Sequence, residues 1–386
     1  MSHVLPSVFG LVFSAGLHVY LWSRIGKPME RGWRRRAVGI AIVVMWLMVP
    51  VTTTARMWAP ELAKVAGWVT LTWMAFAGLT VVALLAIDVG RLAVWAARRV
   101  RGVPASEAVA AGPSRRQFLA GSAAAVAGAS VGVGMIEARG EHEIVDVEVT
   151  LAKLPAALDG FTIVQLSDLH VGMTIGRDFV ERVVSRANAL SPDLILLTGD
   201  LVDGPVADLA DDVAPLAQLH APHGVFATTG NHEYYSGVDA WIAAIEKLGV
   251  RYLRNERVAI QRGGCAFDLA GVDDYSGDNY PGHGEDLDKA LAGRDASRAL
   301  VLMAHQPRQV HHAVDHGVDL QLSGHTHGGQ IWPWHFIVKL QQGGFLGGRY
   351  AVGDTQLYVT RGCGYWGPPV RVLAPLEITR VILRAA

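Results

Sequence analysis

Three long stretches without a charged residue occupy the first part of the chain. Residues 1–23, 37–55 and 65–87 contain no Asp, Glu, Lys or Arg. Each stretch approaches or exceeds the roughly 20 apolar residues that a helix needs to cross a bilayer, and buried helices of soluble proteins rarely run so far without interruption. The pattern therefore predicts three transmembrane helices within residues 1–112. Pro50 and the threonines after it predict an early end for the second helix.

The charged residues around these stretches predict their orientation. Residues 1–116 carry 14 Lys and Arg against 4 Asp and Glu, which leaves 20 against 31 for residues 117–386. Loops rich in Lys and Arg stay in the cytoplasm, so the N-terminus and the loop around Arg56 are expected outside. The two basic loops contain Arg24, Lys27, Arg31, Arg34, Arg35 and Arg36, and Arg91, Arg98, Arg99 and Arg101.

A further membrane segment is expected at residues 113–139. Arg115 and Arg116 precede Gln-Phe-Leu and an uncharged run rich in Ala and Gly that extends to Ile136. This resembles a twin-arginine export signal placed internally, and ordinary basic residues flanking a fourth membrane segment are the alternative. On either interpretation the chain crosses outward. Residues 140–386 are then expected as a domain on the outer, periplasmic face of the cytoplasmic membrane.

From about residue 140 short apolar runs alternate with helical patterns. The runs are rich in Ile, Leu and Val, as strands buried on both faces are, and helical segments fill the gaps between the first ones. This alternation predicts an α/β domain. The expected strands are residues 161–166, 193–198, 225–229, 299–304 and 320–323, and the expected helices are residues 177–190, 209–220 and 238–248.

The last part of the chain predicts a second sheet, mixed or antiparallel, because its strand-like segments are joined by turns. We therefore expect a double-sheet sandwich with helices outside, preceded by the membrane-spanning region. These later segments are residues 257–261, 265–270, 356–360, 370–373 and 376–383.

Five polar clusters follow the strands of the α/β pattern, and together they contain seven potential metal ligands. Ligands of α/β sheets gather beyond the carboxyl ends of the strands, where these clusters fall. A single Asp or His there is usually a cap or a surface residue, but nothing in folding requires five such clusters. The predicted ligands are Asp168, His170, Asp200, Asn231, His305, His325 and His327.

This donor set favours two divalent ions, and Mn, Fe and Zn all accept carboxylate, imidazole and amide ligands. Asp168 and His170 lie two apart on a segment expected to be extended, so both side chains should point to one side. Gly199 should turn the chain so that Asp200 can bridge the ions. His220, His223, His311, His312 and His316 are expected to be surface residues.

His232 is predicted as a catalytic residue rather than a ligand. It directly follows Asn231, and on an extended segment it would point away from the ion toward bound substrate. There it could donate a proton to the leaving alkoxide or stabilise negative charge on the phosphoryl group, with packing in the core as the alternative. Asp203 and Glu233 are expected to orient ligands, because a ligating histidine usually gives its other N–H to a carboxylate or carbonyl.

The series DLH, GDLVD, GNHE, AHQP and GHTHGG resembles the calcineurin-like metallophosphoesterase superfamily, and SRRQFL together with GHTHGGQIWP resembles its membrane-associated bacterial branch. The resemblance covers residues 158–386. It implies one ion on Asp168, His170, Asp200 and His327, and a second on Asp200, Asn231, His305 and His325, with His232 as catalyst. One feature departs from the pattern: Val171-Gly172 stands where many relatives place an arginine near the phosphate.

The resulting prediction is a phosphoesterase, most readily a phosphodiesterase, in which a metal-activated hydroxide attacks in line. Aromatic residues around Trp332, Trp334 and Trp366 suggest an apolar lip for a membrane lipid, with ordinary loop packing as the alternative. Some relatives cleave the pyrophosphate of UDP-2,3-diacylglucosamine, and that is the second enzymatic candidate. A membrane sensor or transport-associated protein that uses the fold only for binding is the non-enzymatic one.

Two classes of feature are not expected. The exported half has no basic stripe with interleaved aromatics, so nucleic acid is not an expected partner. Cys265 and Cys363 lack metal-site spacing, and two unlinked thiols are favoured over a disulfide.

Overall fold

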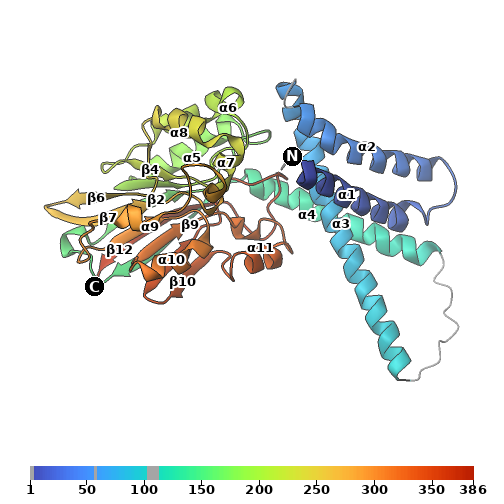
Figure 1. Ribbon diagram of the computed structural model, residues 1–386. Helices are drawn as coiled ribbons and strands as arrows, with labels where there is room; N and C mark the ends of the chain where they lie inside the picture. Colours follow the sequence, from blue (N-terminus) through green and yellow to red (C-terminus); the bar gives the residue numbers. More distant parts are fainter. Residues whose placement is uncertain (1–3, 56–58, 102–112) are drawn as a thin grey trace. The chain divides into compact units, whose positions relative to one another are not determined.

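The computed structural model describes residues 4–55, 59–101 and 113–386, which form two compact units (Figure 1). The first unit contains the described residues up to Met135 together with Gly367–Val370. The second contains Ile136–Trp366 and Arg371–Ala386.

The first unit is helical. Its elements are α1 (Val4–Leu21), a short π-helical turn (Trp22–Gly26), α2 (Trp33–Ala55), α3 (Pro60–Val100) and α4 (Pro113–Arg139). Among the described residues, three segments are long and apolar enough to cross a membrane, and their mean hydropathy is 2.0, 2.0 and 1.7. These segments are Trp33–Ala55, Glu61–Val100 and Arg116–Arg139. Side chains before Val12 lie outside the described part, so the first half of the first predicted span is known only as a helical backbone.

The expected early end of the second helix is wrong, because α2 continues through Pro50 to Ala55. Threonine hydroxyls in its last turn donate to backbone carbonyls, as Thr54 does to Pro50 O at 2.9 Å, and such bonds help membrane helices to tolerate proline. Polar contacts also join α1 and its π-helical turn to α3. The Tyr20 hydroxyl donates to Asp88 at 2.7 Å, and Arg24 pairs with the same carboxylate.

The second unit is a sandwich of two six-stranded sheets. The first sheet has the order β1-β12-β2-β3-β4-β5, and β2, β3, β4 and β5 are parallel to one another. In its register Val164 lies opposite Ile195, and Leu196 opposite Phe226. The strands are β1 (Glu143–Leu151), β2 (Phe161–Leu166), β3 (Leu194–Thr198), β4 (Val225–Thr228), β5 (Arg251–Tyr252) and β12 (Glu377–Ala385).

The second sheet has the order β10-β11-β9-β8-β7-β6. Its inner strands β7, β8, β9 and β11 run parallel, and the edge strands β6 and β10 pair antiparallel. The strands are β6 (Glu256–Arg262), β7 (Cys265–Gly271), β8 (Leu300–Met303), β9 (Leu320–Ser323), β10 (Gly348–Val352) and β11 (Thr355–Val359).

Alternation along each strand builds two kinds of core. Phe161 and Ile163 point between the sheets, against residues such as Phe267 and Val301. Val164, one residue on, faces the helices that cover the first sheet. Helices on both outer faces are visible in Figure 1. They are α5 (Arg177–Ala189), α6 (Val206–Val213) and α8 (Val238–Glu246) on the first sheet, and α9 (Leu287–Leu291) and α10 (Val310–Asp315) on the second. Two further helices, α7 (Asn231–Ser236) and α11 (His335–Gln341), lie in the segments after β4 and β9.

The predicted sandwich is confirmed, with three differences in detail. Residues 370–373 are not a strand, because Val372 makes only an isolated bridge to Ile331. The last strand joins the first sheet, between β1 and β2, instead of the second. The edge strand β1, the two-residue β5 and the edge strand β10 were not predicted, since their short or half-exposed sequences lack a continuous apolar run. Both cysteines are free, as favoured.

Candidate metal centre

The loops after β2, β3, β4, β8 and β9 bring the seven predicted ligands to one edge of the sandwich. Six of them are buried, with at most 6% of each residue exposed, and His325 is half-buried. Buried carboxylates and imidazoles require compensation by partners or ions, because each loses its hydration on folding.

The backbone at this edge adopts a left-handed conformation at five of the seven ligands. The φ angles are 57° at Asp168, 51° at His170, 54° at Asp200, 70° at His325 and 51° at His327. This conformation costs a non-glycine residue roughly 1–2 kcal/mol, and such strain is typically retained at functional sites. It also corrects the expectation that Asp168 and His170 share an extended segment: local left-handed turns, not strand alternation, bring their side chains together.

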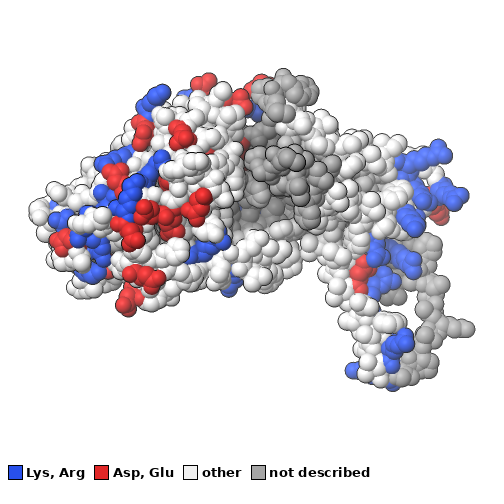
Figure 2. All heavy atoms as spheres, viewed as in Figure 1, with Lys and Arg blue, Asp and Glu red and all other residues white. Residues whose placement is uncertain are grey.

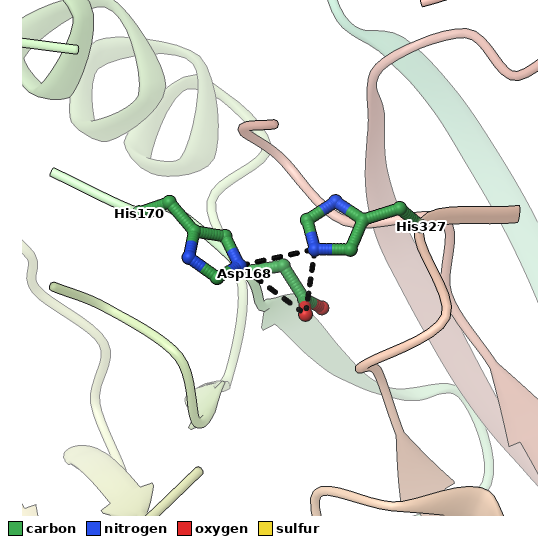
Figure 3. Close-up of side chains that lie close together, drawn as sticks. All are labelled: Asp168, His170 and His327. Carbon is green, nitrogen blue, oxygen red and sulfur yellow. Dashed lines mark hydrogen bonds and ion pairs between the residues drawn. The ribbon is translucent and has the colours of Figure 1, made fainter. Parts of the chain in front are cut away.

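Asp168, His170 and His327 form the first donor group (Figure 3). His327 Nε2 lies 3.4 Å from Asp168 Oδ1, and His170 Nε2 lies 4.0 Å from the same oxygen. Asp200 Oδ2 lies 3.7 Å from His170 Nε2 and so approaches this group from the neighbouring strand.

Asp200, His305 and His325 form the second donor group. His305 Nε2 lies 3.0 Å from Asp200 Oδ2, the same oxygen that approaches His170. Asn231 begins α7 beside this group, and its buried Oδ1 has no hydrogen-bond partner. A buried amide oxygen without a donor is costly, and a bound cation would satisfy it.

The distances within two pairs of imidazole nitrogens indicate whether cations fit between the ligands. His170 Nε2 and His327 Nε2 are 3.0 Å apart, and His305 Nε2 and His325 Nδ1 are 3.2 Å apart. Two protonated ring nitrogens cannot face each other at this separation, so each pair must share one proton or one cation. The residues present therefore fit two divalent ions, with Asp200 common to both groups.

Groups behind the ligands hold them in orientation. His170 Nδ1 donates to Asp203 Oδ1 at 2.9 Å, and His305 Nδ1 donates to Thr198 O at 2.7 Å. Both bonds leave Nε2 facing the other ligands, as metal-binding histidines require. Glu233 accepts from the backbone N–H groups of Gly230, Asp200 and Leu201 at 2.6, 3.0 and 2.7 Å, which clamps the β3 and β4 loops together.

The buried ligands influence each other's protonation. Burial raises the pKa of Asp168. Burial would also raise the pKa of Asp200, but the neighbouring imidazoles of His305 and His232 hold it well below its usual range. Burial and the charge of His305 lower the pKa of His325 to about 3, so His325 offers a neutral nitrogen.

His232 occupies the first turn of α7, not the extended segment that was expected. Its backbone N–H donates to Asp200 Oδ1 at 2.8 Å, and its Nδ1 lies 2.6 Å from Asp203 Oδ1. Burial would lower the pKa of His232, but the carboxylates of Asp200, Asp203 and Glu233 raise it to about 9. The ring contacts Tyr235 and Trp366 edge-on, at centroid distances of 5.3 and 5.6 Å.

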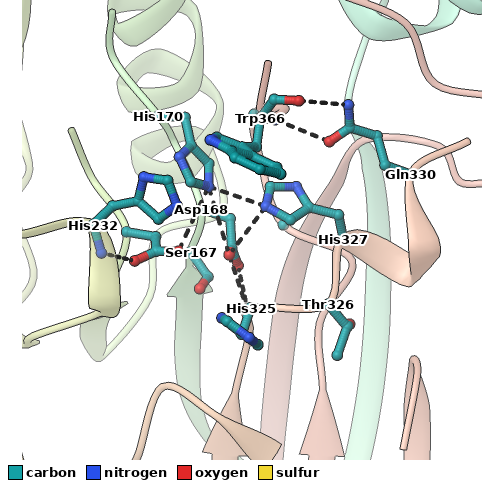
Figure 4. Close-up of polar contacts among 12 residues, drawn as sticks. Ser167, Asp168, His170, His232, His325, Thr326, His327, Gln330 and Trp366 are labelled. Carbon is teal, nitrogen blue, oxygen red and sulfur yellow. Dashed lines mark hydrogen bonds and ion pairs between the residues drawn. The ribbon is translucent and has the colours of Figure 1, made fainter. Parts of the chain in front are cut away.

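Trp366 is held beside the centre by reciprocal bonds to Gln330 (Figure 4). Gln330 Nε2 donates to Trp366 O, and Trp366 N donates to Gln330 Oε1, both at 2.9 Å. The backbone N–H of Trp332 donates to Val372 O at 3.2 Å and so ties the segment before Leu373 to the Trp332 loop. We call the exposed apolar residues of this region the aromatic rim: Trp332, Trp334, Phe336, Ile337, Leu340, Trp366 and Leu373.

Five other histidines lie outside the donor groups, and sequence reasoning missed two buried polar residues. His220, His311 and His312 are exposed, and His223 and His316 are half-buried outside both donor groups. Sequence reasoning missed the buried Asp274, whose carboxylate accepts from Gln306 Nε2 at 3.1 and 3.0 Å. Its only signal was the position of Gln306 beside His305. Also missed was Arg371, whose buried guanidinium donates to the carbonyls of Gly364 and Ala374 at 2.8 Å.

Comparisons with known proteins identify the family of this chain. Residues 161–329 match the family described as calcineurin-like phosphoesterase. A zebrafish (Danio rerio) protein named transmembrane protein with metallophosphoesterase domain is 38% identical over 74% of this chain and 67% of its own length. An uncharacterized metallophosphoesterase of Helicobacter pylori is 41% identical over 64% of this chain and 65% of its own.

A shorter relative is matched nearly throughout. The uncharacterized metallophosphoesterase YkuE of Bacillus subtilis is 33% identical over 70% of this chain and 98% of its own length. The chain thus spans about two thirds of the zebrafish and Helicobacter relatives and almost all of the Bacillus one. It belongs to the calcineurin-like metallophosphoesterases, a family of metal-dependent phosphoester hydrolases.

Proposed function

We propose that this protein hydrolyses a phosphodiester at the candidate metal centre. The observation that carries the proposal is the arrangement of two donor groups around one shared carboxylate oxygen, Asp200 Oδ2, which lies 3.7 Å from His170 Nε2 and 3.0 Å from His305 Nε2. A single structural ion would need neither the second group nor the unpartnered Asn231 oxygen.

The two ions would share Asp200 and otherwise have separate ligands. Asp168, His170, Asp200 and His327 would hold one divalent ion, and Asp200, Asn231, His305 and His325 the other. Mn, Fe or Zn would suit these ligands. When bound, two such ions supply an acidic water for nucleophilic attack and positive charge for the phosphoryl oxygens.

His232 serves as the general acid in this proposal. Its Nδ1 is engaged by Asp203, so the proton available to a leaving alkoxide is held at Nε2. The raised pKa of about 9 favours the protonated ring at neutral pH, although cations on Asp200 would offset part of that effect. Proton donation by a positioned side chain contributes typically ~10²–10⁴-fold to a rate.

The test compares metal content with activity in the full chain, purified in detergent and loaded with Mn²⁺. Wild type should bind two ions and hydrolyse bis(p-nitrophenyl) phosphate faster than p-nitrophenyl phosphate. H232A should keep both ions and lose roughly 10²-fold or more in kcat. D200N should lose metal as well as activity. The exposed His311 supplies the control, since H311A should leave both quantities unchanged.

Two results would contradict the proposal. Hydrolysis at the wild-type rate in D200N or H232A would exclude this mechanism. Metal binding by a wild-type chain that hydrolyses none of a panel of diesters, monoesters and lipid phosphates would favour the alternative of a membrane sensor that only binds.

We further propose that the substrate is a membrane-lipid phosphodiester, hydrolysed on the outer face of the cytoplasmic membrane to which the spanning helices tether the chain. Support comes from the aromatic rim. Trp332 and Trp334 are 49% and 38% exposed, and no residue of α11 is buried, although such apolar side chains are normally covered. Aromatic and aliphatic side chains of this kind favour the membrane interface.

Replacing Trp332 and Trp334 by Ala tests the lipid substrate. Activity toward a phospholipid in vesicles should fall about tenfold, because each tryptophan buries much of its apolar surface in a lipid. Hydrolysis of bis(p-nitrophenyl) phosphate should stay at the wild-type rate. Equal losses of activity on both substrates would show that the aromatic rim does not select the substrate.

A further inference from the structure

Positive charge is concentrated where α2 begins. Arg34, Arg35 and Arg36 follow Trp33 directly, and the first turn of the helix contains no acidic residue. Basic side chains gather at this end of the helical unit (Figure 2). Like charges this close repel one another, and the start of a helix favours acidic residues over basic ones.

These three arginines have no carboxylate partner among the described residues. Asp88, the acidic residue of α3 at this end, is already paired with Arg24. Glu30, in the loop before α2, is exposed and makes no ion pair with them in the described part of the chain. The positive charge at the start of α2 is therefore left for a ligand or for solvent.

Aromatic rings hold two of the arginines in place. The Arg35 Cζ atom lies 5.6 Å from the centroid of the Trp22 ring, and the Arg34 Cζ atom lies 5.6 Å from that of Trp33. Both distances allow a cation–π contact. Trp22 packs on the apolar cluster of the helical unit, and a Cβ on Gly39 would lie 3.1 Å from its ring. The guanidinium of Arg35 thus rests on a fixed platform.

The loop before α2 is also fixed. Gln117 Nε2, in α4, donates to Pro28 O at 3.0 Å, and the backbone N–H of Lys27 donates to Trp22 O at 2.8 Å. The exposed Lys27 and Arg31 of this loop add two further positive charges. The basic surface therefore has a defined shape before any ligand arrives.

One exposed row of α2 begins with a basic residue and continues without charge. Residues three or four positions apart lie on one side of a helix. The row consists of Trp33, Arg36, Ile40, Val44, Leu47 and Val51, all exposed. We call it the α2 row. Its apolar part, from Ile40 to Val51, extends about 16 Å at roughly 1.5 Å per residue, which is close to half of a hydrocarbon core of ~30 Å.

We infer that the α2 row binds an anionic phospholipid, with the phosphate at Arg34, Arg35 and Arg36 and an acyl chain along residues 40–51. Guanidinium groups match the geometry of phosphate oxygens, and basic clusters beside membrane-spanning helices attract anionic lipids. A soluble anion would make no use of the apolar part, and a neutral lipid would make little use of the arginines. The inference is independent of the proposed hydrolysis and of the side of the membrane on which α2 begins.

The experiment measures lipid preference in the full chain. Native mass spectrometry in a neutral detergent compares the binding of phosphatidylglycerol with that of phosphatidylcholine. Wild type should prefer phosphatidylglycerol about 100-fold, because each of three basic residues contributes roughly fivefold to the attraction of an anionic lipid. R34Q/R35Q/R36Q should lose most of this preference. An unchanged preference in that variant would overturn the inference.

The matched control removes three exposed arginines from α3 instead. R91Q/R98Q/R99Q changes the net charge of the helical unit by the same amount and should keep most of the preference. Equal losses in the two triple variants would show a diffuse attraction to positive charge and would contradict a defined site on α2. Lipid held at the candidate metal centre would contribute equally to all three proteins.

Two further measurements complete the test. Glycerol phosphate carries the charge of the headgroup without an acyl chain, so it should not displace bound phosphatidylglycerol. Displacement by an equimolar amount would assign the arginines to a soluble anion and reject the lipid. If R34Q/R35Q/R36Q does not fold, R36Q alone should lower the preference about fivefold, and a preference equal to that of wild type would again overturn the inference.

Discussion

Asp203 connects two histidines that have different roles in the proposed mechanism. Its Oδ1 lies 2.9 Å from His170 Nδ1 and 2.6 Å from His232 Nδ1. Burial would raise the pKa of Asp203, but His170 and His232 hold it well below its usual range, so it is ionised. One carboxylate thus orients a predicted metal ligand and the predicted general acid together.

The D203N variant should therefore lower kcat more than it lowers the number of bound ions. An asparagine cannot supply the charge that both imidazoles face, and loss of such an orienting partner typically costs ~10- to 100-fold in activity or metal affinity. Steady-state kinetics and metal analysis of D203N measure both effects. The exposed Asp208 gives a control, since D208N should behave as wild type. An unchanged kcat in D203N would refute the orienting role.

His142 makes the stability of the second unit depend on pH. The residue is 3% exposed, and its Nε2 donates to Cys363 O at 2.8 Å. Burial lowers the pKa of His142 to about 4, so the folded protein holds it neutral. In the unfolded chain His142 takes up a proton near pH 6.5. The unfolded state is therefore increasingly favoured, and the protein loses stability, as the pH falls from about 6.5 toward 4.

We expect this histidine to account for about 2 to 3 kcal/mol of the stability lost between pH 7.5 and pH 4.5, because pH 4.5 lies roughly two units below the pKa of a histidine in the unfolded chain. Thermal unfolding of wild type and H142Q at both pH values measures it. Glutamine keeps an N–H donor without the titration, so H142Q should lose less stability on acidification than wild type. Equal losses in the two proteins would show that His142 does not titrate on unfolding.

At the scale of elements, the loop after β9 depends on a glycine that meets the loop after β2. A Cβ on Gly324 would collide with Ser167 Oγ and Asp168 Oδ2. The backbone N–H of His325 donates to Asp168 Oδ1 at 2.9 Å, so the two loops are in direct contact. Glycine is required here for close approach and not for an unusual φ.

G324A should displace Asp168 and reduce metal binding, with a loss of stability of about 1 to 3 kcal/mol typical of overpacking. Metal content and melting temperature measure the change. Gly347 is a matched control in the same sheet region, because a Cβ there would meet Arg361 at an ordinary 3.6 Å. If G324A and G347A retain metal equally, the close contact does not position Asp168.

The strands that position the site were predictable, and the edges of the sheets were not. β2, β3, β4, β8 and β9 are buried runs of apolar residues, a pattern that local sequence displays directly. β1 alternates between buried and exposed residues in its second half, and β10 has no buried residue. β1 is a strand because it pairs with β12 at the other end of the domain sequence, and β10 because it pairs with β11, which follows it in the chain.

At the scale of the molecule, one chain combines apolar helices with a hydrolase fold. Figure 2 shows Lys and Arg side chains gathered at one end of the helical unit, while the helices themselves are largely free of charge. This distribution suits a protein whose basic loops stay in the cytoplasm. It supports the proposed multi-pass topology, with residues 140–386 on the outer face.

Protease treatment of spheroplasts tests this topology. Residues 140–386 should be digested in intact spheroplasts, because the proposed domain lies outside the membrane. Exchange of Arg115 and Arg116 for Lys should block its export if the segment is a twin-arginine signal, and leave export unchanged if the arginines only flank a membrane segment. A protected wild-type domain would place the centre in the cytoplasm and favour the UDP-linked lipid pyrophosphate as substrate.

The sequence by itself determined the ligand types, their succession at strand ends and the family resemblance, because these depend on residue chemistry and local periodicity. It also determined the long apolar segments. Only the tertiary structure decided how the ligands meet: five left-handed backbone positions and the helical turn carrying His232 arise from contacts between loops that local patterns do not record.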